Sequence, residues 1–294
     1  MKNIVFCLRH DAFYQNKVNK PTFCGLGDII RGLIFTYAIC KGNEFKFFFD
    51  CKGHSLEPFL NNEEFSFPKE IPEKIPFVYG QDLVQYIRDN IDSETVFLMS
   101  NGHPQQDENI LFDRFKNILK KIFLSNSEIS NLVNLKQYNH SFHARFGDDE
   151  NVDFNFLQKF YVEDGSHQHH PNEWFDLQPK MLKYQKTINF LKDILQEIDF
   201  VCSDHDNFKS HFSKFKKINF FDKGSHTGII SKKESHFNTL CDFYALYNSK
   251  KITSISSFPY GIRKSAFPLW ASKISGNSID FYNLNYKDLS ISSL

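Results

Sequence analysis

The sequence predicts an α/β protein with two parallel β-sheets of the doubly wound kind. Two observations support this expectation. Short apolar runs of strand length alternate with amphipathic stretches of helical length, and the alternation continues along nearly all of the 294 residues. No internal repeat of about 20–50 residues and no low-complexity linker interrupts the pattern.

The alternation runs through the chain twice. In the first run we expect strands at 3–8, 44–49, 77–79 and 95–99, and helices at 29–40, 82–90, 109–124 and 128–135. In the second run we expect strands at 140–145, 199–202, 218–221 and 251–255, and helices at 179–197, 208–215, 234–248 and 262–274. Two such runs predict two Rossmann-like domains, residues 1–138 and 139–294.

Composition restricts the class of protein. Hydrophobic residues make up 41% and charged residues 24%, as in ordinary soluble globular proteins. Lys plus Arg and Asp plus Glu both number 35, so no overall basic field is present to attract nucleic acid. We therefore expect no nucleic-acid partner. A local basic site for a small anionic ligand is compatible with this balance.

The cysteines and the apolar runs indicate a cytoplasmic protein. The six cysteines are scattered without a C-x-x-C pair, and several lie in apolar runs, so we expect buried free thiols in a reducing compartment. No stretch approaches the roughly 20 apolar residues that span a bilayer, and the N-terminus lacks the apolar core of a signal peptide. Peripheral contact with the inner membrane is compatible with this location.

The stretch from His143 to Asp148 is the most informative part of the chain. His143 and Arg145 lie two positions apart at the end of an expected strand, so both side chains point to the same side of the sheet. Gly147 allows a sharp turn, and Asp148 can brace the arginine. Arg grips phosphate oxygens in a planar fork, so the segment indicates a diphosphate site. An ordinary surface ion pair is the alternative.

Polar residues follow other expected strands or open expected helices. Gly25-Leu-Gly27-Asp28 opens a helix whose free amides can receive a phosphate, although Asp28 can equally be a first-turn carboxylate favoured by the helix dipole. Ser203-Asp204 can bind a ribose or base, or cap the next helix. Because ligands bind at the carboxyl ends of parallel strands, these residues favour one shared cleft.

A second anion site is expected before the last helix. Ser256-Ser257-Phe258 and the nearby Arg263 place hydroxyls and a cation around the expected helix start, where free amides add to them. A plain capped helix with exposed cations is the alternative. The run His167-Gln-His169-His170 is too crowded for a structural zinc site, and we expect no metal site.

Taken in order, these motifs resemble the motif series of GDP-fucose-dependent fucosyltransferases, the superfamily of α1,2-, α1,6- and protein O-fucosyltransferases. Gly25-Leu-Gly27-Asp28 is similar to the family's N-terminal turn, and His143-x-Arg145-x-Gly147-Asp148 to its H-x-R-x-G-D motif. The stretch from Asp242 to Phe258 is similar to the donor-binding C-terminal segment.

The resemblance implies a GT-B-like fold, in which two Rossmann-type domains face a cleft and the C-terminal domain holds the donor. It implies that Arg145 neutralises the β-phosphate of GDP with help from His143, and that Asp242 supports the donor pocket. The residues assigned to donor binding are Gly25, Gly27, His143, Arg145, Asp204, Asp242, Ser256, Ser257, Phe258 and Arg263.

The resemblance also implies an inverting, metal-independent glycosyltransferase. Arg145 would stabilise the leaving group, and Asp153 would act as the base for the acceptor hydroxyl, with Glu150, Asp149 and Asp28 as rivals. We expect a GDP-sugar donor, with fucose as the sugar, and a glycan or lipid-linked oligosaccharide acceptor in cell-surface polysaccharide biosynthesis. A heptosyltransferase-type enzyme that uses GDP- or ADP-heptose, or a non-catalytic nucleotide- or glycan-binding protein, remains an alternative.

Overall fold

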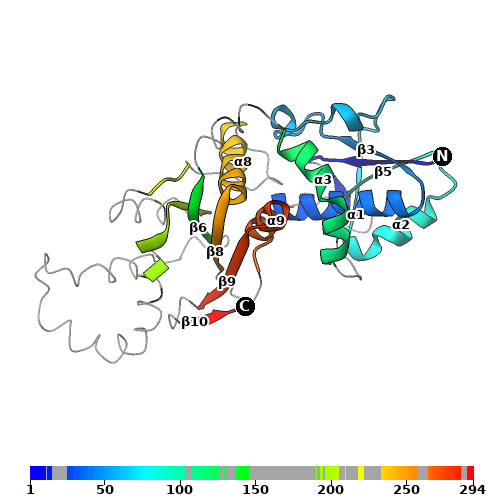
Figure 1. Cartoon of the computed structure of the whole chain (residues 1–294). Helices are drawn as coiled ribbons and strands as arrows, with labels where there is room; N and C mark the ends of the chain where they lie inside the picture. Colours follow the sequence, from blue (N-terminus) through cyan, green and yellow to red (C-terminus); the bar gives the residue numbers. More distant parts are fainter. Residues whose placement is uncertain are drawn as a thin grey trace, which may run out of the picture.

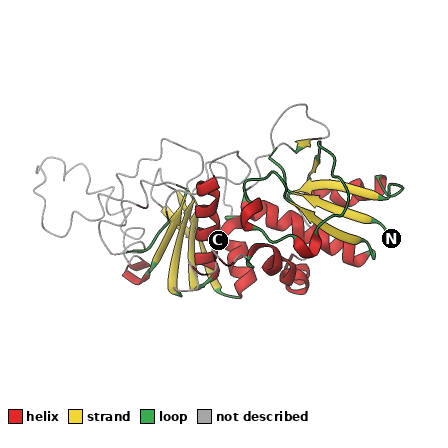
Figure 2. Cartoon of the chain, turned by 90° about the horizontal axis from the view of Figure 1, so that it is seen from above, coloured by secondary structure: helices red, strands yellow, loops and turns green. Residues whose placement is uncertain are grey.

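The structure is a computed structural model. It describes residues 1–10, 12–14, 25–102, 108–125, 137–145, 196–204, 218–221, 233–256, 264–285 and 290–294, together with isolated positions between these ranges. Two five-stranded sheets form the framework, and helices lie between and around them (Figures 1 and 2).

The first sheet is entirely parallel and has the order β2-β4-β5-β1-β3. Its strands are β1 (Asn3–Cys7), β2 (Phe13–Tyr14), β3 (Lys46–Asp50), β4 (Pro76–Val78) and β5 (Thr95–Ser100). β1 lies inside the sheet and is apolar from Ile4 to Cys7, as expected for a parallel strand that is buried on both faces.

Helices cover this sheet. They are α1 (Leu26–Gly42), α2 (Leu83–Asp89) and α3 (Glu108–Phe123), with short 3-10 turns η1 (Glu57–Phe59), η2 (Glu63–Phe65) and η3 (Gly80–Asp82). α1 packs on the end of β5 so closely that a Cβ atom on Gly32 would lie 1.7 Å from the carbonyl oxygen of Ser100. The glycine therefore fixes the height of α1 above the sheet.

The second sheet has the order β10-β9-β8-β6-β7. Its strands are β6 (Tyr138–Arg145), β7 (Phe200–Ser203), β8 (Ser249–Ser256), β9 (Ser278–Asn285) and β10 (Ser290–Ser293). Four of them are parallel, and β10 returns antiparallel to β9 at the edge. The helices described around this sheet are α8 (Lys233–Tyr247) and α9 (Ala266–Ser275).

The two sheets are joined through one hydrophobic core. α9 of the second part packs against α1 and α3 of the first part (Figure 1). The hydroxyl of Tyr244 on α8 donates a hydrogen bond to the carbonyl oxygen of Phe123 on α3. Trp270, Tyr244 and Phe123 are all buried in the same cluster as the strands of the first sheet. Each sheet is nevertheless built from its own part of the chain.

The α/β class with parallel sheets is confirmed, two local expectations are wrong, and one hairpin was not predicted. Residues 218–221 form a single bridge, from Asn219 to Phe200, where we expected a strand. α9 begins at Ala266, later than the expected start at 262. The hairpin of β9 and β10 was missed, because its polar and apolar residues alternate and no long apolar run marks it.

The expected helices at 128–135, 179–197 and 208–215 lie largely outside the described residues. The five described cysteines, Cys7, Cys40, Cys51, Cys202 and Cys241, are buried and free, as expected. None of the described helices combines the length and the apolar character that crossing a membrane requires.

Candidate functional site

Polar side chains gather at the carboxyl edge of the second sheet. β7, β6 and β8 are neighbouring parallel strands, and their register places Arg145 beside Ser256 and Ala144 beside Ser203. Arg145, Ser203 and Ser256 therefore end at the same edge, as the sequence predicted. Neighbouring parallel strands bring these residues together although more than 50 positions separate each pair along the chain.

Arg145 and Ser256 also share one face of the sheet. His143 and Ser254 precede them by two positions, and the Nδ1 atom of His143 lies 3.0 Å from Oγ of Ser254. The ring of His143 stacks on Phe267 of α9, with 5.9 Å between the centroids. Side chains two positions apart point to the same face, so Arg145 and Ser256 face the side on which α9 begins.

His143 is a neutral, buried histidine. Burial lowers the pKa of its imidazole to about 3, and the positive charge of Arg145 adds to this effect. Its bond to Ser254 also occupies one of the two ring nitrogens. At neutral pH His143 therefore contributes no positive charge, and Arg145 is the cationic member of the predicted pair.

Arg145 is half-buried, and no carboxylate among the described residues forms an ion pair with it. Gly147 and Asp148, the predicted turn and brace, lie outside the described residues. A half-buried guanidinium at a strand end has several N–H donors in a planar fork to offer an anion.

Beside Arg145, the hydroxyl of Ser256 is another polar group that could bind a ligand. Its hydroxyl is fully buried and has no hydrogen-bond partner within the described part of the chain. Leaving a buried hydroxyl without a partner costs about 1–3 kcal/mol, so a partner supplied by a ligand would recover that energy. On β7, which β6 separates from β8, the Ser203 hydroxyl lies 3.5 Å from Oδ1 of Asp204.

The first turn of α1 has amides without an acceptor inside the helix, and an ion-paired carboxylate. Gly25 is the N-cap and provides no side-chain cap, and its carbonyl accepts hydrogen bonds from the amides of Asp28 and Ile29. The helix itself offers no acceptor for the N–H groups of the two residues before Asp28. The carboxylate of Asp28 pairs with Arg31 and remains 37% exposed. Both interpretations of this turn, an anion site and a favourable first-turn carboxylate, are compatible with this geometry.

Asp242 lies in a buried ion pair. Its Oδ2 atom is 3.6 Å from Nζ of Lys209, and the two side chains are 8% and 2% exposed. Lys209 also donates a hydrogen bond to the carbonyl oxygen of Phe221 at 3.0 Å. The structure thus gives Asp242 a partner within the second part of the molecule. Asp153, Ser257, Phe258 and Arg263 lie outside the described residues, and their roles stay predictions.

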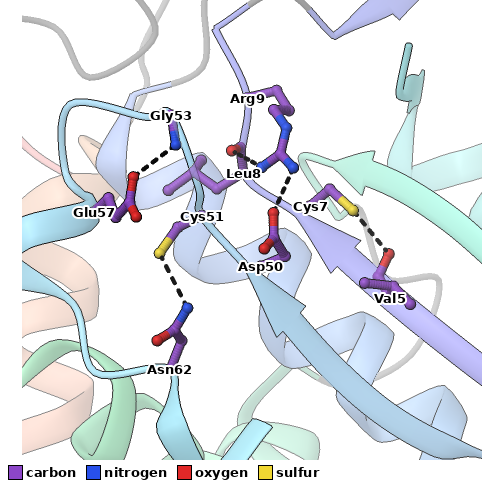
Figure 3. Close-up of polar contacts among 9 residues, drawn as sticks. All are labelled: Val5, Cys7, Leu8, Arg9, Asp50, Cys51, Gly53, Glu57 and Asn62. Carbon is purple, nitrogen blue, oxygen red and sulfur yellow. Dashed lines mark hydrogen bonds and ion pairs between the residues drawn. The ribbon is translucent and has the colours of Figure 1, made fainter. Parts of the chain in front are cut away.

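The sequence interpretation missed polar groups at the carboxyl edge of the first sheet. Arg9 follows β1 and Asp50 ends β3, and the two form an ion pair with side chains 14% and 13% exposed (Figure 3). Arg9 also donates a hydrogen bond to the carbonyl oxygen of Leu8 at 3.0 Å. Both residues come directly after apolar runs, so the rule that found Arg145 could have found them.

Three histidines stack where the first sheet meets α8. The ring centroids of His10 and His54 are 3.9 Å apart, and His236 of α8 lies 5.9 Å and 6.1 Å from them. No sequence signal links these residues, because they are far apart along the chain. Among the described residues, no group of three or more His, Cys, Asp or Glu side chains is arranged to hold a metal ion. The run 167–170 lies outside those residues.

No family model matches the sequence, and no curated protein matches it. Two solved structures are similar over the full chain. One is a NodZ α-1,6-fucosyltransferase soaked with GDP-fucose, at 12% identity and a TM-score of 0.50. The other is a NodZ α-1,6-fucosyltransferase co-crystallised with GDP, at 12% identity and a TM-score of 0.51. Each match covers 100% of this chain and 98% of the other. The chain therefore has the expected GT-B-like α/β fold.

Proposed function

We propose that this chain is a glycosyltransferase that transfers fucose from GDP-fucose to a glycan acceptor. The observation that carries the proposal is the strand-end pair of Arg145, without a described carboxylate partner, and Ser256, with a buried unpartnered hydroxyl. The full-length likeness to structures that hold GDP-fucose or GDP supports the donor class. The order of the motifs along the chain supports it further.

The chemistry needs a group that stabilises the departing diphosphate. Arg145 would bind the β-phosphate through its planar fork, and the Ser256 hydroxyl would donate a second hydrogen bond. His143 is neutral and would position the strand end through Ser254. Together with helix N-termini, such donors replace the charge stabilisation that a divalent cation would give. We therefore propose a metal-independent reaction that inverts the anomeric centre.

The base for the acceptor hydroxyl is proposed to be Asp153. Its rivals are Glu150 and Asp149, which lie outside the described residues, and Asp28, which the heptosyltransferase-type alternative would use. In the structure the Asp28 carboxylate is already bound by Arg31, so a role as base would require that contact to open. Asp204, Ser257, Phe258 and Arg263 are proposed to contact the nucleotide.

A thermal-shift panel of GDP, UDP, ADP and CMP tests the donor class. A ligand at 100 times its Kd stabilises the folded state by about 2.7 kcal/mol. For a chain of this size that corresponds to roughly 4–5 °C in Tm. We expect GDP to give this shift and the other nucleotides to give little. The Arg145→Ala variant should lose the shift. A panel without a GDP effect, or with equal effects of all four nucleotides, would refute the proposal.

Activity separates the alternatives. With GDP-fucose and a glycan acceptor, we expect GDP release that a chelator does not reduce. A non-catalytic binding protein would show the GDP shift but release no GDP. A heptosyltransferase-type enzyme would lose all activity in Asp28→Asn, whereas the proposed chemistry should be reduced most by Arg145→Ala.

A further inference from the structure

Gly27 is a point of close contact between the two parts of the molecule. A Cβ atom at this position would lie 2.6 Å from Cβ of Ala266 and 2.8 Å from its carbonyl carbon. It would also lie 3.0 Å from the backbone nitrogen of Phe267. Gly27 stands in the first turn of α1 and Ala266 is the first residue of α9, so the missing side chain lets the beginnings of two helices touch.

This contact leads directly to the strand-end site. Phe267, the next residue of α9, stacks on His143. His143 shares its face of the sheet with Arg145 and is bonded to Ser254, whose strand ends at Ser256. A chain of contacts therefore runs from Gly27 through the start of α9 to the candidate anion-binding groups. The amides in the first turn of α1, which have no acceptor inside the helix, lie at the other end of this chain of contacts.

We propose that Gly27 is a positioning residue for the donor site. Its lack of a side chain seats α1 of the first sheet on α9 of the second sheet, and this contact sets where the α1 amides stand relative to Arg145 and Ser256. The assignment rests on the proposed GDP-sugar function. It differs from the sequence prediction that Gly27 itself binds the donor, because here the essential partner of Gly27 is Ala266.

The structure gives the size of the perturbation. Ordinary van der Waals contact is 3.4–4 Å, so an alanine at position 27 requires the two helix ends to part by about 1 Å. Misplacing catalytic groups by about 1 Å can reduce a rate on the order of 10²-fold. Fold stability is less affected, because the helix ends lie at the junction and the sheets retain their own packing.

Three variants test the assignment. Gly27→Ala introduces the contact, and Gly42→Ala makes the same change at the exposed end of the same helix, where a Cβ atom has nothing within 4 Å. Gly27→Ala combined with Ala266→Gly removes the nearest colliding atom and leaves the 2.8 Å and 3.0 Å backbone contacts, so it should restore function in part. Each variant is measured by hydrogen exchange in peptides covering 25–34 and 264–272, and by titration with GDP.

We expect Gly27→Ala to accelerate exchange in both peptides and to raise the Kd for GDP by about tenfold, which is about 1.4 kcal/mol. Gly42→Ala should change neither, and the double variant should recover part of both effects. The assignment is overturned if Gly27→Ala behaves like Gly42→Ala. It is also overturned if GDP binding falls while exchange in 264–272 is unchanged and Ala266→Gly gives no recovery, since Gly27 would then act on the ligand directly.

The exchange data do not depend on a ligand, so the proposed function and the positioning role of Gly27 can be refuted separately. If the parent protein binds no GDP, the proposed function is wrong. The link between Gly27 and a GDP site is then wrong as well, even where the exchange pattern shows the helix contact. If the parent binds GDP and the exchange pattern is absent, only the positioning role of Gly27 is lost.

Discussion

The buried pair of Lys209 and Asp242 allows a stability prediction with a matched control. Its two side chains are 2% and 8% exposed, and the charged atoms are 3.6 Å apart. The pair Lys251–Asp280 has nearly the same separation, 3.5 Å, but its side chains are 45% and 50% exposed. Changing Asp to Asn in each pair removes the same charge from two different environments.

The expected costs differ because solvent screens only one pair. Two unit charges about 4 Å apart interact by about 4 kcal/mol at an effective dielectric constant of 20, and breaking a buried pair typically costs about 3–5 kcal/mol. Exposed pairs contribute only about 0–1 kcal/mol. We expect Asp242→Asn to lower the free energy of unfolding by about 3–5 kcal/mol and Asp280→Asn by less than about 1 kcal/mol.

Urea unfolding at neutral pH measures both variants against the parent, with the slope of the transition as a check on the unfolded state. Equal small losses in both variants would show that the ion pair at Asp242 is not buried as described. GDP titration of folded Asp242→Asn tests whether Asp242 also contributes to the predicted donor pocket. A lost GDP affinity without a loss of stability would assign Asp242 to the donor pocket, as the sequence predicted.

Three further predictions concern the strand-end site and the thiols. Ser256→Ala should raise the free energy of unfolding of the ligand-free protein by about 1–3 kcal/mol, because it removes a buried hydroxyl that has no partner in the described chain. The same variant should weaken GDP binding in titrations, and a stability loss above about 1 kcal/mol would indicate a structural hydrogen bond. In the folded protein the pKa of His143 is about 3, so its imidazole is neutral, whereas the unfolded imidazole takes up a proton below about pH 6.5. The free energy of unfolding therefore falls as the pH drops from about 6.5 towards 3 and is unaffected above that range. Between pH 7 and pH 5 the parent should therefore lose about 2 kcal/mol more than His143→Gln in urea unfolding, and equal losses would contradict the buried neutral state. Burial raises the pKa of the Cys7 and Cys51 thiols to about 12, so these thiols should react with a thiol reagent at pH 8 only after unfolding, and rapid labelling of the native protein would disprove their burial.

Sequence reasoning located the strand ends because each carries a local signal. Arg145, Ser203 and Ser256 each close an apolar run, and the carboxyl ends of parallel strands meet at one edge. The order β8-β6-β7 that makes them neighbours has no local signal. Sequence alone could therefore gather these residues at an edge but could not pair Arg145 with Ser256.

The start of α9 was misplaced for a physical reason. The expected start at 262 follows Pro259, and proline is common near the first helical position because it lacks an N–H that the helix does not use there. The structure begins the helix after Ser265 and places Pro268 in the first turn, where the same rule applies. Pro259 and Pro268 satisfy the same criterion, so the sequence could not choose between them.

Contacts between the two parts could not be predicted at all. The stacked rings of His10, His54 and His236 come from distant stretches and have no shared periodicity. The close packing at Gly27 depends on Ala266 of a helix that lies 239 positions further along the chain. No local sequence rule could therefore have predicted it. Such contacts arise only when both sheets are in place.

The shared core also limits how the chain can be cut. Phe123 and Tyr244 meet across the junction, and Trp270 is buried in the same cluster. A recombinant fragment that stops near residue 138 would expose the apolar sides of α1 and α3 to water and would tend to aggregate. Chimeric proteins that exchange one half for that of another protein with this fold will need α1, α3, α8 and α9 to be exchanged or redesigned together.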